Sequence, residues 1–190
     1  YNKNKKIKIH NSDILKFNIE KIIKKNTVIF GNLPYNISSQ ILVKILKFNN
    51  WPPNFQDLVL MFQKELGEKI LGKFPSSNYG RLSILTGYRL KVIEKFLVSS
   101  NCFFPKPKVT SLVIHFKPKD KIKFSIKNID SLEKITNILF SNKRKMINKN
   151  LKKILNKKEI SKLKNIQLSS RPSEIKPEIY YKITEIYEKK

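Results

Sequence analysis

Two continuous apolar runs, at residues 28–30 and 58–62, constrain the fold of this chain most. Each run is short, and each is followed by a segment whose apolar residues recur at helical spacing. Such runs are typical of strands that are buried inside a sheet. Strands that alternate with helices in this way predict an α/β fold with helices on both faces of the sheet.

The rest of the chain shows weaker sequence patterns for strands and helices. Strands are predicted at residues 6–10, 96–98 and 111–116, and helices at about 38–46, 64–71 and 82–88. Because a loop without a helix joins the last two strands, they are expected to form an antiparallel hairpin at one edge. Beyond the proline-containing stretch near residue 118 only helical patterns remain. This predicts an α/β domain at residues 1–119 and a small, basic, all-helical domain at 120–190.

The net charge of +26 is the strongest signal in the composition. It favours a polyanion partner, nucleic acid rather than an anionic membrane, although a solvated lysine-rich surface would carry the same residues. No apolar run is long enough to span a membrane. The single cysteine, Cys102, excludes an internal disulfide and fits a cytoplasmic location, and the separation of His10 from His115 argues against a metal site.

The segment Asn32-Leu33-Pro34-Tyr35 directly follows the first buried strand. Ligands of open α/β sheets bind beyond the carboxyl ends of the strands, where this segment is expected to lie. The side-chain carbonyl of Asn32 and the backbone carbonyls around Pro34 can accept N–H bonds, and the ring of Tyr35 can stack on a flat partner. The segment therefore predicts a site for an amino group on a planar ring, or else an ordinary turn between strand and helix.

A second candidate site is the proline-punctuated loop at residues 101–110. Phe103 and Phe104 stand before its prolines, which can hold a ring rigidly for stacking on a base, unless one or both rings belong to the core. Lys106 and Lys108 follow in the same loop and can meet phosphates.

Two further groups of residues are candidates for binding. Lys143, Arg144 and Lys145 are predicted to lie on a helix and to contact phosphates, unless they form an ordinary solvated face. Asp13 follows the first predicted strand, where its carboxylate can accept a hydrogen bond from a nucleotide, unless it caps a helix or a turn.

Taken together, these residues resemble the small-subunit rRNA adenine dimethyltransferases. The matching blocks are Asp13 and residues 30–36, 63–65, 79–83, 103–111, 142–145 and 171–174. They cover essentially the whole chain in order and with family-like spacing. Each block alone is modest evidence, whereas several in order are specific.

The resemblance implies a Rossmann-like methyltransferase domain followed by a helical domain. It implies that methyl groups pass from S-adenosylmethionine to the exocyclic amine of two adjacent adenosines. These lie in the 3′-terminal hairpin loop of small-subunit, 16S-type rRNA, which implies a role in ribosome biogenesis on the small-subunit precursor, for a protein expected to be monomeric. It also implies that Asp13 contacts the cofactor's adenine, that Asn32 sits between cofactor and target amine, and that Tyr35 and Phe103 sandwich the target base.

One departure from the family pattern stands out. In the family, a glycine-rich loop and an acidic residue that holds the cofactor's ribose lie upstream of the position that matches Asp13. Nothing in this sequence matches them. The chain is therefore expected to be the family without its first strands, and to bind cofactor poorly and be inactive by itself. Micromolar cofactor binding in calorimetry would overturn that expectation.

Three other functions share part of this pattern. The large-subunit rRNA adenine methyltransferases that confer macrolide resistance share the segment at residues 32–35, but residues 79–83 and the lysine-rich C-terminal part favour the small-subunit group. A DNA adenine methyltransferase usually has proline where this chain has Leu33. A non-catalytic RNA-binding assembly factor or mitochondrial transcription factor is disfavoured by the intact Asn32, Tyr35 and Phe103.

Overall fold

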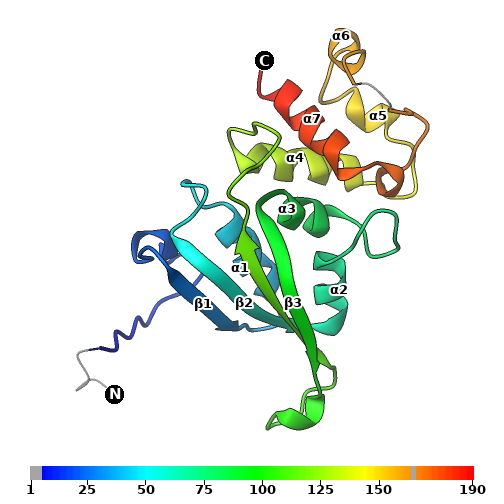
Figure 1. Cartoon of the computed structure of the whole chain (residues 1–190). Helices are drawn as coiled ribbons and strands as arrows, with labels where there is room; N and C mark the ends of the chain where they lie inside the picture. The colour runs from blue at the N-terminus through cyan, green and yellow to red at the C-terminus, as the bar shows by residue number, and fades with distance from the viewer. Residues whose placement is uncertain (1–5, 164–165) are drawn as a thin grey trace.

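A mixed sheet forms the centre of the first part of the chain. The computed structural model describes residues 6–163 and 166–190. Within them, the strands lie in the order β1 (Thr27–Asn32), β2 (Phe55–Gln63), β4 (Ser111–Pro118) and β3 (Leu90–Val98) (Figure 1). β1 and β2 are parallel, and β4 is antiparallel to both of its neighbours, so the predicted hairpin is confirmed. β3 begins well before residue 96 because its pairing with β4 extends that far.

Helices α1 (Ser38–Leu46), α2 (Lys64–Ile70) and α3 (Arg81–Arg89) cover one face of this sheet (Figure 1). That face presents Ile29, Leu58, Leu60, Phe62, Leu112, Ile114 and Phe116, which belong to or pack against the core. Right-handed crossovers place successive helices of this kind on the same side of a sheet.

The opposite face of the sheet is open among the described residues. Its side chains on the outer strands remain exposed, with Phe30 of β1 at 76% and Phe96 of β3 at 54%. The prediction of helices on both faces is therefore wrong for the part of the chain that the structure describes. The continuous apolar run that suggested two buried faces in β1 is partly buried on one side and exposed on the other.

The strand predicted at residues 6–10 is also wrong. These residues have no strand conformation and all five are exposed. An alternating pattern forms a strand only where a neighbouring strand supplies hydrogen bonds, and the described strands do not pair with this segment.

The regular secondary structure of the described C-terminal residues is helical, as predicted, with turns and loops between the helices. It contains α4 (Ile129–Phe140), α5 (Asn148–Leu151), α6 (Lys157–Ile160), the short 3-10 turn η3 (Pro172–Glu174) and α7 (Pro177–Tyr187). α4 packs against α7 and against α3, which joins this part to the sheet-covering helices. No helix in the described ranges has both the length and the apolar character needed to cross a membrane.

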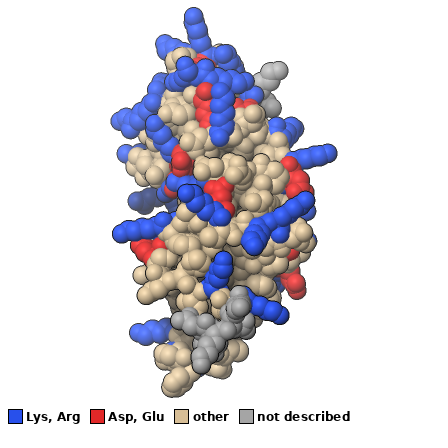
Figure 2. Space-filling model, turned by 90° about the vertical axis from the view of Figure 1, so that its left-hand side faces the viewer, with Lys and Arg blue, Asp and Glu red and all other residues tan. Residues whose placement is uncertain are grey.

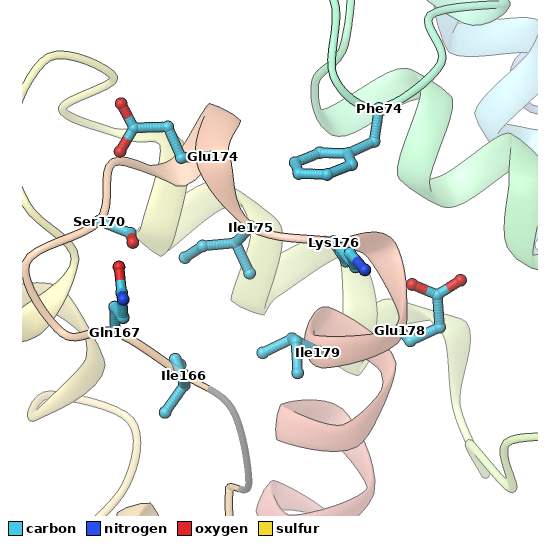
Figure 3. Close-up of a pocket in the computed structure, with 9 residues that line it drawn as sticks. All are labelled: Phe74, Ile166, Gln167, Ser170, Glu174, Ile175, Lys176, Glu178 and Ile179. Carbon is cyan, nitrogen blue, oxygen red and sulfur yellow. The ribbon is translucent and has the colours of Figure 1, made fainter.

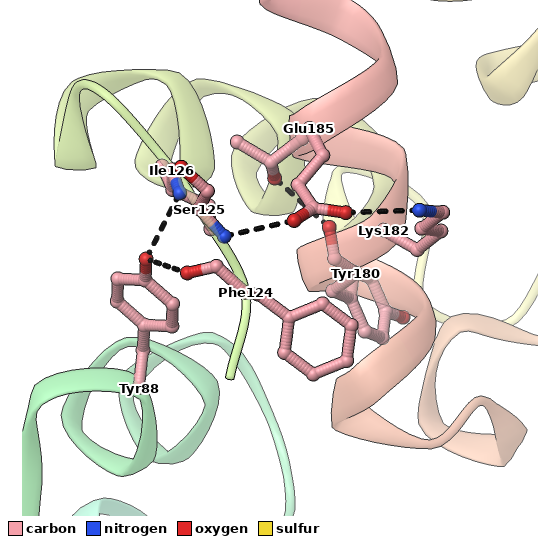
Figure 4. Close-up of polar contacts among 8 residues, drawn as sticks. Tyr88, Phe124, Ser125, Ile126, Tyr180, Lys182 and Glu185 are labelled. Carbon is pink, nitrogen blue, oxygen red and sulfur yellow. Dashed lines mark hydrogen bonds and ion pairs between the residues drawn. The ribbon is translucent and has the colours of Figure 1, made fainter. Parts of the chain in front are cut away.

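The segment that leads into the helical part is held from two sides (Figure 4). The Tyr88 hydroxyl of α3 donates to the Phe124 carbonyl at 2.9 Å and accepts the Ile126 N–H at 3.2 Å. The Glu185 carboxylate of α7 accepts the Ser125 N–H at 2.8 Å. These bonds fix the segment between α3 and α7.

Two buried tyrosines cross the same junction. The Tyr79 hydroxyl donates to the Ile175 carbonyl at 2.9 Å, and the Tyr181 hydroxyl donates to the Ile84 carbonyl at 3.0 Å. Burial raises the pKa of both phenols, so they stay protonated donors. The sheet part and the helical part therefore share buried polar contacts, and the boundary after residue 119 stays a prediction.

Candidate functional site

The loop after β1 forms the first component of the candidate site. Asn32 is the last residue of β1, paired in register with Met61 of β2, and its side chain is exposed. No described residue hydrogen-bonds that side chain. The preceding Gly31 lets the chain pass closely, because a Cβ there would lie 2.7 Å from the side chains of Leu33 and Leu60. The carboxamide is thus free at the carboxyl end of the parallel strands, where it was predicted.

Hydrogen bonds fix the backbone of this loop. The Pro34 carbonyl accepts the Ile37 N–H at 3.2 Å, and the Tyr35 carbonyl accepts the Ser38 hydroxyl at 3.1 Å. The Leu33 carbonyl has no partner among the described residues. Of the backbone acceptors around Pro34, the one at Leu33 is therefore fully available to a ligand.

A single hydrogen bond joins this loop to a distant part of the chain. The Tyr35 hydroxyl lies 2.7 Å from the Ser111 hydroxyl, and Ser111 is completely buried as the first residue of β4. Ser111 pairs in register with Gln63 of β2 and Val98 of β3. The bond fixes the position of the Tyr35 ring, a role for Ser111 that the sequence did not reveal.

Two other sequence blocks meet beside this bond. Residues 63–65 end β2 and begin α2, and the Lys64 N–H donates to the Thr110 carbonyl at 2.9 Å. Gln63, Lys64, Glu65, Glu68, Val109 and Thr110 surround a hollow of about 340 Å³. Amide and carboxylate acceptors therefore stand next to the loop of Asn32 and Tyr35, where they can recognise polar groups of a ligand.

The aromatic candidates lie on the segment between β3 and β4, which projects from this end of the sheet (Figure 1). Phe103 follows the short turn η2 (Ser100–Cys102) and is partly buried, whereas Phe104 is fully exposed. Neither ring belongs to the buried core, so the interpretation of both as core residues is wrong. Lys106 and Lys108 of the same segment are exposed.

The basic candidates Lys143, Arg144 and Lys145 do not lie on a helix. α4 ends at Phe140 and these residues form an exposed turn. The Ser141 hydroxyl donates to the Ile138 carbonyl at 2.9 Å, a side-chain bond of the kind that competes with helix propagation. Positive side chains nevertheless gather over this helical end of the molecule and are sparser toward the other end (Figure 2).

Asp13 lies in an exposed turn. Its Oδ1 accepts the Leu15 N–H at 2.9 Å, and its backbone carbonyl accepts the N–H groups of Lys16 and Phe17. The turn alternative for this residue is therefore correct as a local structure, and the second carboxylate oxygen is left for a ligand. Among residues 6–163 and 166–190, no cluster of three His, Cys, Asp or Glu side chains suits a metal ion.

Comparison with known sequences identifies the family. A sequence model described as Ribosomal RNA adenine dimethylase matches residues 1–189. A Ribosomal RNA small subunit methyltransferase A from Pelagibacter ubique (strain HTCC1062) is 44% identical over 186 residues, covering 96% of this chain and 70% of that protein. A protein of the same name from Malacoplasma penetrans (strain HF-2) is 40% identical over 183 residues, covering 94% and 65%. The chain thus spans about two thirds of the length of these relatives.

Solved structures agree with this assignment. A dimethyladenosine transferase from Plasmodium falciparum matches with a TM-score of 0.70 at 26% identity, over 92% of this chain and 70% of that one. The 23S rRNA methyltransferase ErmE matches with a TM-score of 0.63 at 18% identity, over 94% and 71%, which shows a shared fold. The predicted Rossmann-like fold class is confirmed. The chain belongs to the ribosomal RNA adenine dimethylase family.

Proposed function

We propose that the full-length protein containing this chain methylates the exocyclic amine of two adjacent adenosines in the 3′-terminal hairpin loop of small-subunit rRNA, with S-adenosylmethionine as methyl donor. The proposal includes action as a cytoplasmic monomer on the small-subunit precursor during ribosome biogenesis. The observation that carries it is the bond between Tyr35 and Ser111, which assembles the loop after β1 and the segment before β4 into one site. The small-subunit names of the sequence relatives support the choice of rRNA.

The chemistry of the amine explains why carbonyl groups are needed. The nitrogen of an adenine amine is a poor nucleophile because its lone pair is delocalised into the ring. The Asn32 side-chain carbonyl and the free Leu33 carbonyl beside Pro34 can each accept one N–H and draw the hydrogens out of the ring plane. The lone pair then localises on the nitrogen, so positioning and electrostatics carry the reaction without a strong base.

Asp13 and Asn32 are proposed to bind the methyl donor. The exposed Asp13 carboxylate keeps one oxygen free to accept the amine of the donor's adenine, and Asn32 lies between that position and the target amine in this proposal. S-adenosylmethionine, when bound, supplies an electrophilic methyl group.

The target base must leave its stack to reach Asn32. Tyr35, held by Ser111, and the partly buried Phe103 are proposed to form the two walls that receive it. Stacking on such walls is worth about 1–3 kcal/mol per base. Lys106 and Lys108 would then hold phosphates near the target, while Lys143, Arg144 and Lys145 would hold a more distant part of the RNA.

A methylation assay on separated ribosomal subunits tests the choice of substrate. Small and large subunits that lack adenine methylation are incubated with the full-length protein and radiolabelled S-adenosylmethionine. Label is expected in small-subunit rRNA as dimethyladenosine at two adjacent positions. Label in large-subunit rRNA instead would support the second candidate, a methyltransferase of the ErmE kind, whose fold this chain shares.

The role of Ser111 gives a separate prediction. Ser111→Ala is expected to lower kcat for methyl transfer by about tenfold, because the Tyr35 ring loses the hydrogen bond that orients it. Tyr35→Phe removes the same bond from its other end, so the double variant should lose no more than either single variant. Ser161→Ala, at an exposed serine after α6, is the matched control. Additive losses in the double variant would show that the bond does not position the ring.

A further inference from the structure

A groove runs beside α1 from the candidate site toward the helical part of the molecule. Its volume is about 600 Å³. It is lined by Leu15, by Ser39, Gln40, Val43 and Lys44 of α1, by Lys47 directly after α1, by Arg81, Leu82 and Leu85 of α3, and by Glu133 of α4. Ser39 begins the groove only four residues after Tyr35. The groove thus begins close in sequence to the candidate site and reaches the helical part at Glu133 of α4.

Arg81 is the residue of this groove whose positive charge has no partner among the described residues. It is the first residue of α3 and is partly buried, and its Nε is buried without a hydrogen-bond partner. No described residue pairs with its guanidinium. A cation that is partly removed from water is costly unless an anion or several acceptors compensate it. A partly buried guanidinium without a partner is therefore suited to bind an anion from outside the chain.

The carboxylates around the groove are already engaged. Glu133 lies 2.6 Å from the Lys47 ammonium, and Asp130 lies 2.7 Å from the same group. Burial lowers the pKa of Lys47, but the two carboxylates more than offset this and raise it. The ion pairs of Lys47 therefore hold the end of α1 against α4. The Lys44 ammonium donates to the Leu15 carbonyl at 2.5 Å and keeps further N–H groups available.

We propose that this groove binds a phosphodiester of the RNA strand that flanks the target adenosine, through Arg81 and Lys44. This inference rests on the proposed function. Arg81 supplies a planar guanidinium suited to two phosphate oxygens, and Lys44 adds a second positive charge. The apolar floor of Val43, Leu82 and Leu85 suits the sugar or base that accompanies the phosphate. The continuity of the groove with Ser39 places the phosphate within reach of a strand whose base is held at Tyr35.

A hollow in the helical part does not suit the same ligand. It has about 550 Å³ and lies between Phe74 and the start of α7 (Figure 3). Ile175 and Ile179 point into it, and Glu174 and Glu178 stand at its rim beside Lys176. Carboxylates at the rim repel a phosphate, whereas the groove along α1 leaves its only lining carboxylate paired to Lys47.

RNA binding by variant chains tests the proposal. The probe is a fluorescein-labelled RNA hairpin with two adjacent adenosines in its loop, followed by anisotropy between 50 and 200 mM KCl. Arg81→Gln is expected to bind about tenfold more weakly and to reduce the salt dependence by about 0.7 in the slope of log K against log salt. Lys44→Gln should act in the same direction. The control Lys25→Gln removes one charge from an exposed site before β1 and should change neither quantity appreciably.

A phosphate scan separates a specific contact from a general loss of charge. Neutral methylphosphonates are placed one at a time around the hairpin loop. At one position the wild-type chain should lose about tenfold in affinity while Arg81→Gln loses nothing further. Equal losses by both chains at every position would overturn the assignment, as would hairpin affinity unchanged by Arg81→Gln.

Thermal melting and methyl transfer complete the test. The melting temperature of Arg81→Gln should stay equal to or above that of the wild type, because a partnerless charge is removed. A clear fall would assign Arg81 a structural role and reject the site. A full-length wild-type protein that binds the hairpin but transfers no methyl group would reject the proposed function alone, and one that binds no hairpin would reject both.

Discussion

Asn32→Ala is expected to reduce methyl transfer by about a hundred- to a thousandfold while the fold and the RNA affinity remain unchanged. A preorganised acceptor or donor at a reacting group contributes about this much to kcat. The Asn32 carboxamide is exposed at the end of β1 and no described residue hydrogen-bonds it, so its removal breaks no structural contact. The loss should appear in kcat rather than in the affinity for RNA, because the carbonyl acts on the amine as its lone pair localises.

Asn36 supplies the matched control for this experiment. It is a second exposed asparagine in the same loop, four residues farther along the chain. Asn36→Ala should keep nearly wild-type turnover, and both variants should melt at the wild-type temperature and bind the hairpin equally. Turnover of Asn32→Ala at the wild-type rate would remove the role proposed for this carbonyl and leave a binding protein as the better description.

Arg89→Met is expected to lower the free energy of unfolding by about 3 kcal/mol, a large fraction of the stability of a domain of this size. Arg89 is buried at the end of α3. Its Nη1 donates to the carbonyls of Leu46 at 2.5 Å and Phe48 at 2.8 Å, and its guanidinium lies 4.5 Å from the centre of the Trp51 ring. Burial lowers its pKa, yet these contacts hold the charged form at the C-terminal end of α1.

The same helix provides the control for this measurement. Arg81 and Arg89 are the first and last residues of α3, but only Arg89 has hydrogen-bond acceptors among the described residues. Urea unfolding should therefore show a lower midpoint for Arg89→Met and no loss for Arg81→Met, with similar m-values for both. Equal destabilisation of the two variants would mean that burial of the arginine stems, rather than hydrogen bonding, sets their contributions.

The sequence predicted the parts of the candidate site that depend on local order along the chain. The apolar run at residues 28–30 indicated a strand, and the polar segment after it had to lie at the carboxyl end of that strand. The structure places Asn32 there. The hairpin of β3 and β4 was predicted from the absence of a helix between two strand patterns. The family followed from the order and spacing of several short blocks, a property of the sequence alone.

The failed predictions share a physical cause. An alternating pattern at residues 6–10 and a run of basic residues at 143–145 are compatible with a strand and a helix, but neither pattern contains the partner that would stabilise the element. The first has no neighbouring strand among the described residues, and in the second the Ser141 hydroxyl bonds the Ile138 carbonyl at the end of α4. Helices on both faces were expected for the same reason, since an apolar run does not show whether one or both faces are covered.

The sequence by itself determined the fold class, the family and the identity of the chemical groups at residues 32–35. Only the tertiary structure decided which of those groups have partners. It joined Tyr35 to Ser111 across 76 positions, and among the residues that the structure describes it gave Arg89 two carbonyls and Arg81 none. From the sequence, the two arginines of α3 cannot be distinguished, because helix propensity and charge depend only on the residue and its neighbours along the chain. The cost of burying a charge depends on the acceptors within about 3 Å of it, and these come from other segments of the chain.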